Sequence, residues 1–493
     1  MTGDEHAGVA FPSTAEGRRS TSSLGRAVVV DALRPVDPAG ALAAEHETAW
    51  RTGYVGHFRR LVEAGLISPE AAVTIAAAGL ESLHQRMRWI NARGETALEA
   101  LPWAEDARPV RTQKVTGDGV AQTQLMLPWD GELLHGDRLR RKLDEWVAAG
   151  VVEPSCAEAV GIVAAHPEWL PLAGRTVAVL GAGAELGPLP TLLRWGVRVA
   201  AVDLPVPALW ERILTMARRS AGTLLVPGRA PVSGSEMSSD SVHGLDLIRE
   251  LPSAAGWLEG LPDRLVMGNY VYADGATNVR VSCAVDALTV RLLGTGCDAD
   301  LAFLATPTDV FAVPRAAVEH SVAAYAARSR TAKLLGRPLR TVSGGRLLRR
   351  GYVPGVEPGI NDSLVPAQGP NYALAKRLQR WRATVARAAG VTVSLNVAPP
   401  TRTRSVLKNR ALAAAYAGAH RFGVRVFEPS TANVLMAALL VHDLHTGGGP
   451  KHEHPWQDEA HAAVHGGLWR TPYAPRSALG LAALVGYAGT RNA

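Results

Sequence analysis

The stretch TVAVLGAGAELGPLPTLLRWGVRVAAVD, residues 176–203, says most about how this chain folds. It begins with the short apolar run 176–180 and continues through a glycine-rich turn. An apolar segment of helical character then leads into a second β-branched run at 198–202. A strand, a tight turn, a helix and a second strand in this order are typical of a β-α-β unit. The stretch therefore predicts an α/β domain with a parallel sheet.

Three glycines, Gly181, Gly183 and Gly187, shape the turn. Gly181 permits the tight turn, Gly183 lets the backbone approach a diphosphate, and Gly187 allows the helix to pack closely on the strand. The N–H groups and dipole of the helix start favour the phosphate charge, provided that the carboxylate of Glu185 points away. Asp203 follows 22 residues after Gly181, where a carboxylate accepts hydrogen bonds from an adenosine ribose. The turn therefore predicts a dinucleotide site, and NAD is favoured over NADP because Asp203 would repel a 2′-phosphate.

Downstream of Leu172, short apolar runs alternate with longer helical ones. A run that is apolar on every residue is typical of a strand buried on both faces. The predicted strands are 176–180, 198–202, 223–226, 264–267, 301–305 and 391–397. The predicted fold class is α/β, with a Rossmann-like doubly wound parallel sheet spanning 171–447. Within it, the Gly-, Pro- and Arg-rich stretch 312–370 predicts an insertion with a helix and a long loop.

The flanking segments differ in composition from this domain. Residues 1–25 are rich in Gly, Ser and Thr, which predicts a disordered tail. Residues 26–170 show apolar residues at every third or fourth position, which predicts a helical N-terminal domain. Residues 448–493 are predicted to be a His-rich loop and a C-terminal segment.

Overall composition narrows the function classes. The 493 residues are 47% hydrophobic and 20% charged, as in a globular protein with a real core. A net charge of +7 without an aromatic-interleaved basic run argues against nucleic-acid binding. Three scattered cysteines make neither a disulfide framework nor a zinc site. The N-terminal residues do not resemble a signal peptide, and no run of 18 apolar residues lacks charge. We therefore expect a cytoplasmic protein without a membrane span; a homo-oligomer is compatible with the sequence.

Tyr372 and Lys376 lie four residues apart in a segment of helical character. On a helix this spacing places both side chains on one face. A nearby ammonium can lower the pKa of a phenol, which makes the tyrosine a usable proton donor or acceptor near neutral pH. The helix leads into the apolar run 391–397 and then into Pro399, Pro400 and Thr403.

This order of segments resembles the short-chain dehydrogenase/reductase family, whose Tyr-x-x-x-Lys helix precedes a strand that ends in a Pro-Gly-x-x-x-Thr-like loop. The resemblance covers about residues 174–445 and implies a nicotinamide cofactor. It implies that Tyr372 is the acid/base and that Lys376 holds the nicotinamide ribose and lowers the pKa of Tyr372. Thr403 would lie near the carboxamide.

Further segments are similar to the family in the same frame. Asn269 ends the fourth predicted strand, where the family often has Asn-Ala-Gly, and Asn278 corresponds to the family's helix Asn. Residues 301–306 resemble the fifth strand, which ends at the catalytic Ser of the family. The segment that begins at Pro429 resembles its last core helix.

The sequence also departs from the family pattern. The glycine spacing is Gly-x-Gly-x-x-x-Gly, whereas the family has Gly-x-x-x-Gly-x-Gly, and Pro400 replaces the usual Gly. The family's Ser lies about a dozen residues before the Tyr, where this chain has Gly359. A hydroxyl from Thr306 or Thr308 fits the strand order, whereas Ser363 is nearer in sequence, and the sequence leaves this choice open.

Two other groups of polar residues are candidates for binding a metal ion or an anionic substrate. Six histidines fall between residues 442 and 465, and His461 and His465 have the i,i+4 spacing of a shared metal on one helix. No cysteine or well-placed acid completes a ligand set, so no metal site is predicted. Arg402, Arg404 and Lys408 follow the run 391–397, where they would either grip an anionic substrate or form a solvated face.

These observations favour an NAD-linked oxidoreductase that acts on the carbonyl/alcohol pair of a small-molecule substrate. An S-adenosylmethionine-dependent methyltransferase is a rival, because its first motif has the same order of elements. It usually carries an acid just before the loop, where this chain has the apolar run 176–180. A non-catalytic nucleotide-binding or scaffold protein of the same fold is the second rival.

Overall fold

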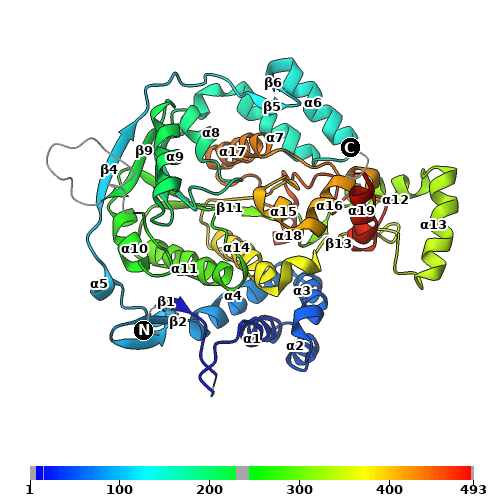
Figure 1. The fold of residues 1–493 in the computed structure, drawn as a ribbon, viewed down its shortest axis with the longest axis horizontal. Helices are drawn as coiled ribbons and strands as arrows, with labels where there is room; N and C mark the ends of the chain where they lie inside the picture. The colour runs from blue at the N-terminus through cyan, green and yellow to red at the C-terminus, as the bar shows by residue number, and fades with distance from the viewer. Residues whose placement is uncertain (1–6, 15, 229–243, 490–493) are drawn as a thin grey trace.

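A seven-stranded sheet forms the centre of the computed structural model, which describes residues 7–14, 16–228 and 244–489 (Figure 1). Its order is β14-β11-β10-β7-β8-β9-β4, and all neighbours are parallel except β4 and β9. The strands are β4 (Arg111–Thr116), β7 (Arg175–Leu180), β8 (Arg198–Val202), β9 (Thr223–Gly228), β10 (Arg264–Asn269), β11 (Ala299–Ala305) and β14 (Val393–Val397). Numbered along the chain, the six parallel strands read 3-2-1-4-5-6, which is the Rossmann order. The predicted fold class and the six predicted strands are confirmed.

The two faces of the sheet bury separate sets of side chains, because successive residues of a strand point to opposite sides. In β7, Val177 and Val179 belong to one buried cluster, whereas Ala178 and Leu180 belong to the other. The first face is covered by α6 (Gly136–Ala148), α7 (Pro154–Ala165), α8 (Leu189–Arg194), α9 (Pro207–Arg218) and α17 (Pro429–His445). The second is covered by α10 (Leu251–Glu259), α11 (Gly275–Gly294) and α14 (Gly369–Ala388).

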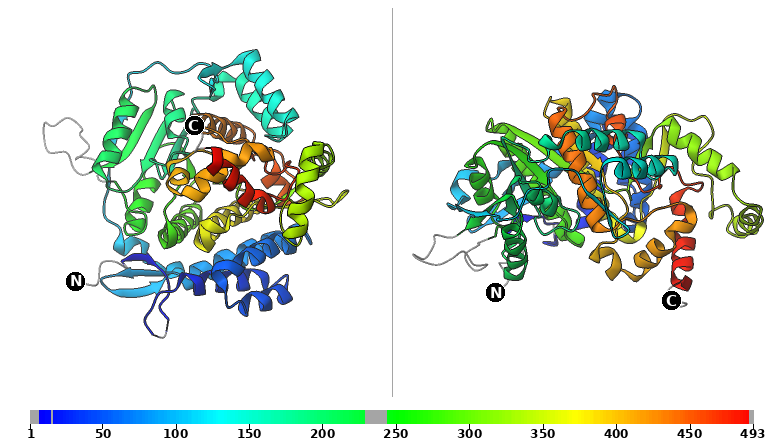
Figure 2. Two further views of the ribbon diagram at one scale, coloured as in Figure 1. Left: turned by 45° about the vertical axis from the view of Figure 1, so that its right-hand side comes forward. Right: turned by 90° about the horizontal axis from the view of Figure 1, so that it is seen from above.

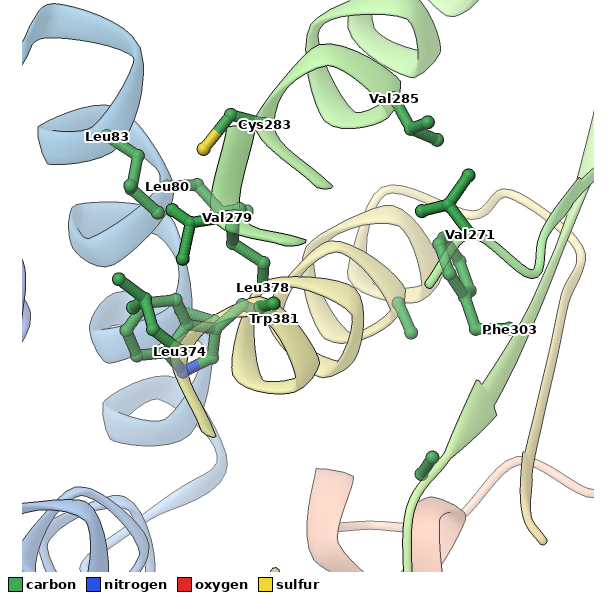
Figure 3. Packing of buried hydrophobic residues seen from close by; sticks show 14 of the residues in the cluster. Leu80, Leu83, Val271, Val279, Cys283, Val285, Phe303, Leu374, Leu378 and Trp381 are labelled. Carbon is green, nitrogen blue, oxygen red and sulfur yellow. The ribbon is translucent and has the colours of Figure 1, made fainter. Parts of the chain in front are cut away.

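A further helical layer lies outside α11 and α14 (Figure 1). It consists of α1 (Thr21–Leu33), α2 (Pro38–Glu45), α3 (Trp50–Gly65) and α4 (Pro69–Arg86). Figure 3 shows Leu80 and Leu83 of α4 beside Val279, Leu378 and Trp381 of the two inner helices. A Cβ at Gly79 would lie 2.4 Å from the ring of Trp381, so α4 can approach α14 only because this residue is glycine. The N-terminal layer therefore shares its core with the helices that form one side of the Rossmann fold.

The prediction of a disordered tail is wrong for the described residues before 26, and residues 1–6 lie outside the described part of the chain. Strand β1 (Gly8–Ala10) pairs with β2 (Arg88–Asn91), which in turn pairs with β3 (Gly94–Ala97). The guanidinium of Arg280 also donates hydrogen bonds to the carbonyl oxygens of Ala7 and Val9. Backbone pairing of this kind fixes a segment whose composition alone suggests no structure.

The segment 26–170, predicted to be a helical N-terminal domain, contains strands as well as helices. Besides β2, β3 and a short helix α5 (Trp103–Asp106), it holds the hairpin β5 (Leu127–Trp129) and β6 (Glu132–Leu134). Strand β4 joins the edge of the main sheet, and its side chains are mostly exposed and polar. An edge strand of this composition lacks the apolar run that marks a buried strand. The predicted boundaries at 170 and 447 stay predictions.

The predicted insertion between β11 and α14 holds more structure than a helix and a long loop. It contains α12 (Arg315–Ala326) and α13 (Arg330–Val342), between β12 (Val310–Val313) and β13 (Gly359–Asp362), which pair with each other. Helix α13 stands out from the body of the molecule in both views of Figure 2.

The C-terminal part of the chain is also more helical than predicted. It contains α15 (Arg404–Lys408), α16 (Arg410–Gly418), α18 (Pro455–Ala460) and α19 (Pro475–Gly489). Across the described residues, no helix combines the length and the apolarity needed to cross a bilayer.

Candidate active site

A cavity of about 840 Å³ opens at the carboxyl ends of the parallel strands. Its wall is formed by the segments that follow five strands, with Gly181 after β7, Asp203 after β8, Asn269 at the end of β10, Thr306 after β11 and Ala398 after β14. Ligands of open α/β sheets bind at this edge, near the point where the strand order reverses. The cavity therefore brings together residues that the sequence analysis selected for two different roles.

The glycine-rich turn forms one end of the cavity. Gly181 has a φ of +84°, and a Cβ there would lie 2.9 Å from the carbonyl oxygen of Tyr270, so this position requires glycine. A Cβ at Gly183 would meet Leu209 Cδ1 at 2.5 Å, whereas the predicted approach of Gly183 to a diphosphate stays a prediction. Gly183 thus makes room for a neighbouring side chain. Gly187 also lines the cavity, as the chain turns into α8.

The carboxylate of Asp203 braces this turn. It accepts hydrogen bonds from the N–H of Gly183 at 2.7 Å and from the N–H of Leu204 at 2.8 Å. Burial raises the pKa of Asp203, and these two hydrogen bonds act in the opposite direction. The neighbouring wall is apolar, with Leu209 and Leu245 among the lining residues. Asp203 is thus held in a fixed position beside the glycine-rich turn.

Glu185, the acid within the turn, forms an ion pair with Arg404 of α15. It accepts hydrogen bonds from the backbone N–H of Arg404, at 2.7 Å, and from its guanidinium. Its negative charge is therefore compensated by a residue that lies far away in sequence, on α15. Arg402 lies 3.4 Å from Glu428, whereas Lys408 lines the cavity itself. Of the three cations that the sequence offers for an anionic substrate, Lys408 is the one best placed.

Tyr372 marks the other end of the cavity, near the N-terminus of α14. Its phenol lies near the hydroxyls of Thr306 and Thr308 and the side chain of Gln368, and all three groups act to lower its pKa. The two threonine hydroxyls lie 2.9 Å apart, and Thr308 donates to Gln368 Oε1 at 3.0 Å. The structure thus places two hydroxyls and one carboxamide around the predicted proton donor.

Burial raises the pKa of Tyr372 above its ordinary value of 10.0, and the nearby side chains of Thr306, Thr308 and Gln368 offset this shift only in part. The prediction that Lys376 lowers the pKa of this phenol is therefore wrong for the protein as described. The phenol keeps its proton at neutral pH, which suits donation of a proton to a substrate oxygen.

Lys376 lies one helical turn beyond Tyr372 and lines the same cavity. Burial lowers the pKa of this lysine to about 8. Its ammonium donates to Gln379 Oε1 at 3.1 Å, and Gln379 donates in turn to Asn269 Oδ1 at 3.2 Å. This chain of hydrogen bonds connects α14 with the end of β10 beneath the cavity floor.

A buried ion-pair network fixes the threonines relative to Tyr372. Asp309 follows Thr308 directly and binds Arg377 at 2.7 Å and Arg380 at 2.6 Å, both on α14. Burial acts to raise the pKa of Asp309, but the charges of the two arginines outweigh it and the pKa lies below its ordinary value. Arg380 also binds Glu459 at 2.6 Å. Segment 306–309 is thus anchored to the helix that carries the phenol.

Three predicted residues take other positions or roles. Ser363 is buried, donates its hydroxyl to Asn361 Oδ1 and lies outside this cavity, so the open choice of hydroxyl falls to the threonines. Asn278 is buried in the first turn of α11, where it accepts a hydrogen bond from the N–H of Ala273, and it does not line the cavity. Thr403 lines the cavity but also caps α15 through the N–H of Val406.

The histidine-rich segment is not arranged as its spacing suggested. Helix α18 ends at Ala460, so His461 and His465 do not share a helix. His465 is fully buried and pairs with Glu153 at 2.9 Å. In the described ranges, no group of three or more His, Cys, Asp or Glu side chains is placed to hold a metal ion.

Two further residues of this site, Gln368 and Tyr272, were not predicted from the sequence. Gln368 lies four residues before Tyr372, so the i,i+4 spacing that joined Tyr372 to Lys376 also pointed to it. Tyr272 follows β10, and its ring stands edge-on to that of Tyr372 with centroids 6.3 Å apart. Its position shortly after a strand end was the available signal.

Comparison with known proteins gives similarity over part of the chain. No family model matches it, and no curated protein does. An A1-type ketoreductase matches with 15% identity and a TM-score of 0.31, over 55% of this chain and 46% of that one. A thiolation-reductase di-domain from an archaeal non-ribosomal peptide synthetase matches with 11% identity and a TM-score of 0.24, over 53% and 49%. The chain thus spans about half the length of each. The fold assignment rests on the strand order.

Proposed function

We propose that this protein is an NAD-dependent oxidoreductase that interconverts a carbonyl and an alcohol. The observation that carries the proposal is the single cavity that joins the glycine turn and Asp203 to the cluster around Tyr372. At about 840 Å³ it falls in the range of cofactor and ligand sites. The resemblance to short-chain dehydrogenases/reductases, seen in the sequence, supports the same reading.

The residues present fit a dinucleotide. The turn at Gly181 has no room for a side chain, and Asp203 offers carboxylate oxygens as hydrogen-bond acceptors. Asn269 and Thr403 line the cavity between the two ends. When bound, the nicotinamide cofactor supplies or accepts the hydride.

The residues of the chain handle the proton. In the reductive direction, the phenol of Tyr372 donates its proton to the substrate oxygen, which becomes the alcohol oxygen. Thr306 donates a hydrogen bond that orients this oxygen, while Thr308 is engaged with Gln368. Lys376 supplies positive charge in the same cavity, where its ammonium would hold the nicotinamide ribose. Lys408 at the mouth would attract an anionic substrate.

The test is isotope transfer. The purified chain is incubated with NADH that carries deuterium at the transferable position and with a panel of small ketones and aldehydes, and the alcohols are analysed by mass spectrometry. We expect deuterium in at least one alcohol product. If NADH fails to bind, or binds while no label reaches any product, the proposal is contradicted.

A further inference from the structure

A second, smaller cavity of about 80 Å³ lies beside the first. Its wall is almost entirely apolar, with Leu364, Val365, Leu412, Ala415, Leu479 and Ala482 among the lining residues. Three residues, Thr308, Leu412 and Tyr416, line both cavities. The two spaces therefore adjoin at Thr308, Leu412 and Tyr416.

The outer wall of this side cavity is a tightly packed pair of helices, α16 and α19, which lie side by side in Figure 1. A Cβ at Gly418 would lie 2.0 Å from the carbonyl oxygen of Ala482, and a Cβ at Gly486 would lie 1.9 Å from that of Ala414. The two backbones thus touch at glycines. The side cavity remains open because Ala415 and Ala482, which also line it, have short side chains.

Polar groups along the wall have partners elsewhere. Ser363 donates to Asn361, Arg476 binds Asp362 at 2.7 Å, and Thr471 donates to the carbonyl oxygen of Phe422 at 2.7 Å. A buried water needs two to four polar partners, and the polar groups along this wall are already bonded elsewhere. An apolar group needs no hydrogen-bond partner there. The space exceeds the roughly 10–15 Å³ that one water requires, so it has room for several carbon atoms.

We propose that the side cavity is a subsite for an apolar substituent of the substrate. A carbonyl oxygen placed at Tyr372 and Thr306 would put one of the two groups on the carbonyl carbon next to Thr308, and the side cavity accepts that group as an unbranched alkyl chain. The inference rests on the proposed function and makes it narrower: the substrate is a ketone or aldehyde with a short alkyl chain on one side.

The test measures binding without turnover. Straight-chain 2-ketones from butanone to octanone are titrated into the full chain by calorimetry, while NADH oxidation is followed in separate samples. We expect the affinity to rise about fourfold for each added methylene group over the first few carbons and then to level off, because each buried methylene contributes a near-constant transfer free energy. An affinity independent of chain length overturns the subsite.

Two variants and a control locate the effect. Ala415→Phe and the milder Ala482→Leu fill the side cavity and should abolish the gain with chain length, whereas Ala411→Phe on the exposed side of α16 should keep it. A gain that survives in a folded cavity variant overturns the proposal; if both cavity variants fail to fold, the wild-type series decides. Chain-length dependence without NADH oxidation would support the subsite and contradict the proposed function. NADH oxidation without chain-length dependence would do the opposite.

Discussion

The two ends of the main cavity are built in different ways. At the nucleotide end, the contacts come from one continuous segment, in which the turn at Gly181 and the carboxylate of Asp203 lie on consecutive strands. At the chemical end, Thr306, Gln368 and Tyr372 come from segments separated by the insertion. The first end depends on local spacing, whereas the second depends on tertiary packing through Asp309 and its arginines.

The two ends also differ in charge. The nucleotide end carries Asp203 and Glu185, and the latter is compensated by Arg404. The chemical end carries the ammonium of Lys376, whose pKa is lowered to about 8 by burial. Substitutions at the chemical end should therefore change the rate, whereas substitutions at the nucleotide end should change cofactor affinity and choice.

The largest effect is expected for Tyr372→Phe. Loss of the proton donor should lower kcat by about 10²- to 10⁴-fold, the usual contribution of general acid catalysis, with NADH affinity nearly unchanged. Steady-state kinetics and NADH fluorescence titration measure the two quantities. Tyr54→Phe is the matched control, because its buried hydroxyl lacks a partner among the described residues and lies outside the cavity. Equal kcat values in the two variants would contradict the role of Tyr372 as proton donor.

The next largest effect separates the two threonines. Thr306→Val should lower kcat on the order of 10- to 100-fold, as expected for loss of a hydrogen bond to a group that becomes charged. Thr308→Val should cost less, because Thr308 also donates to Gln368. Thr289→Val removes a buried hydroxyl from α11 and serves as the control for stability. A larger loss in Thr308→Val would reverse the assignment.

The pH dependence of kcat/KM tests the role of Lys376. Because kcat/KM reports ionisations of the free enzyme, its value for carbonyl reduction should fall by about tenfold per pH unit above pH 8, as the ammonium loses its charge. Tyr372 stays protonated there, since its pKa is raised. In Lys376→Met, whose activity should be lower at every pH, this limb should be absent. An unchanged alkaline limb in the variant would assign it to another group.

The lowered pKa of Lys376 also makes the free energy of unfolding depend on pH. Its pKa is about 8 in the folded protein against an ordinary value of 10.5, so below pH 8 the folded state carries the full cost of a buried charge. Between pH 8 and 10.5 the unfolded chain binds more protons, and this lysine adds a rise with pH to the free energy of unfolding. Denaturant titrations should show that rise reduced in Lys376→Met.

The smallest effect is expected for Asp203→Asn at the nucleotide end. Loss of the negative charge removes the repulsion of a 2′-phosphate and weakens the contact with the ribose. The ratio of NADPH to NADH affinity should rise about fivefold or more, equivalent to roughly 1 kcal/mol. Asn keeps an oxygen for the N–H of Gly183 but turns its amide nitrogen toward the N–H of Leu204, so the melting temperature without nucleotide should fall modestly. An unchanged affinity ratio would place the ribose elsewhere.

The sequence predicted the parts of the structure that follow from local pattern. The strand-turn-helix-strand unit, the six buried strands and the shared face of Tyr372 and Lys376 all depend on spacing within short segments. Strand order made Thr306 and Thr308 candidates, but the sequence left the choice between them and Ser363 open. Ser363 was a poorer candidate than its distance in sequence suggested, because β13 directs it toward Asn361.

The remaining parts depend on contacts that no local pattern records. Strand β4 is polar and pairs with β9 across the sheet edge, and β1 is held by β2 and by Arg280. The contact between Glu185 and Arg404 joins two residues that lie 219 positions apart in the sequence. The pKa of Tyr372 depends on how deeply α14 is buried, which the helical spacing does not specify.

Thermal unfolding with and without nucleotide tests whether the turn at Gly181 holds a dinucleotide. The account predicts that NADH raises the melting temperature of the wild-type chain, with a stabilisation of about 2.7 kcal/mol at a hundredfold excess over Kd, and that S-adenosylmethionine does not. A melting temperature that NADH leaves unchanged, or that S-adenosylmethionine alone raises, would contradict it.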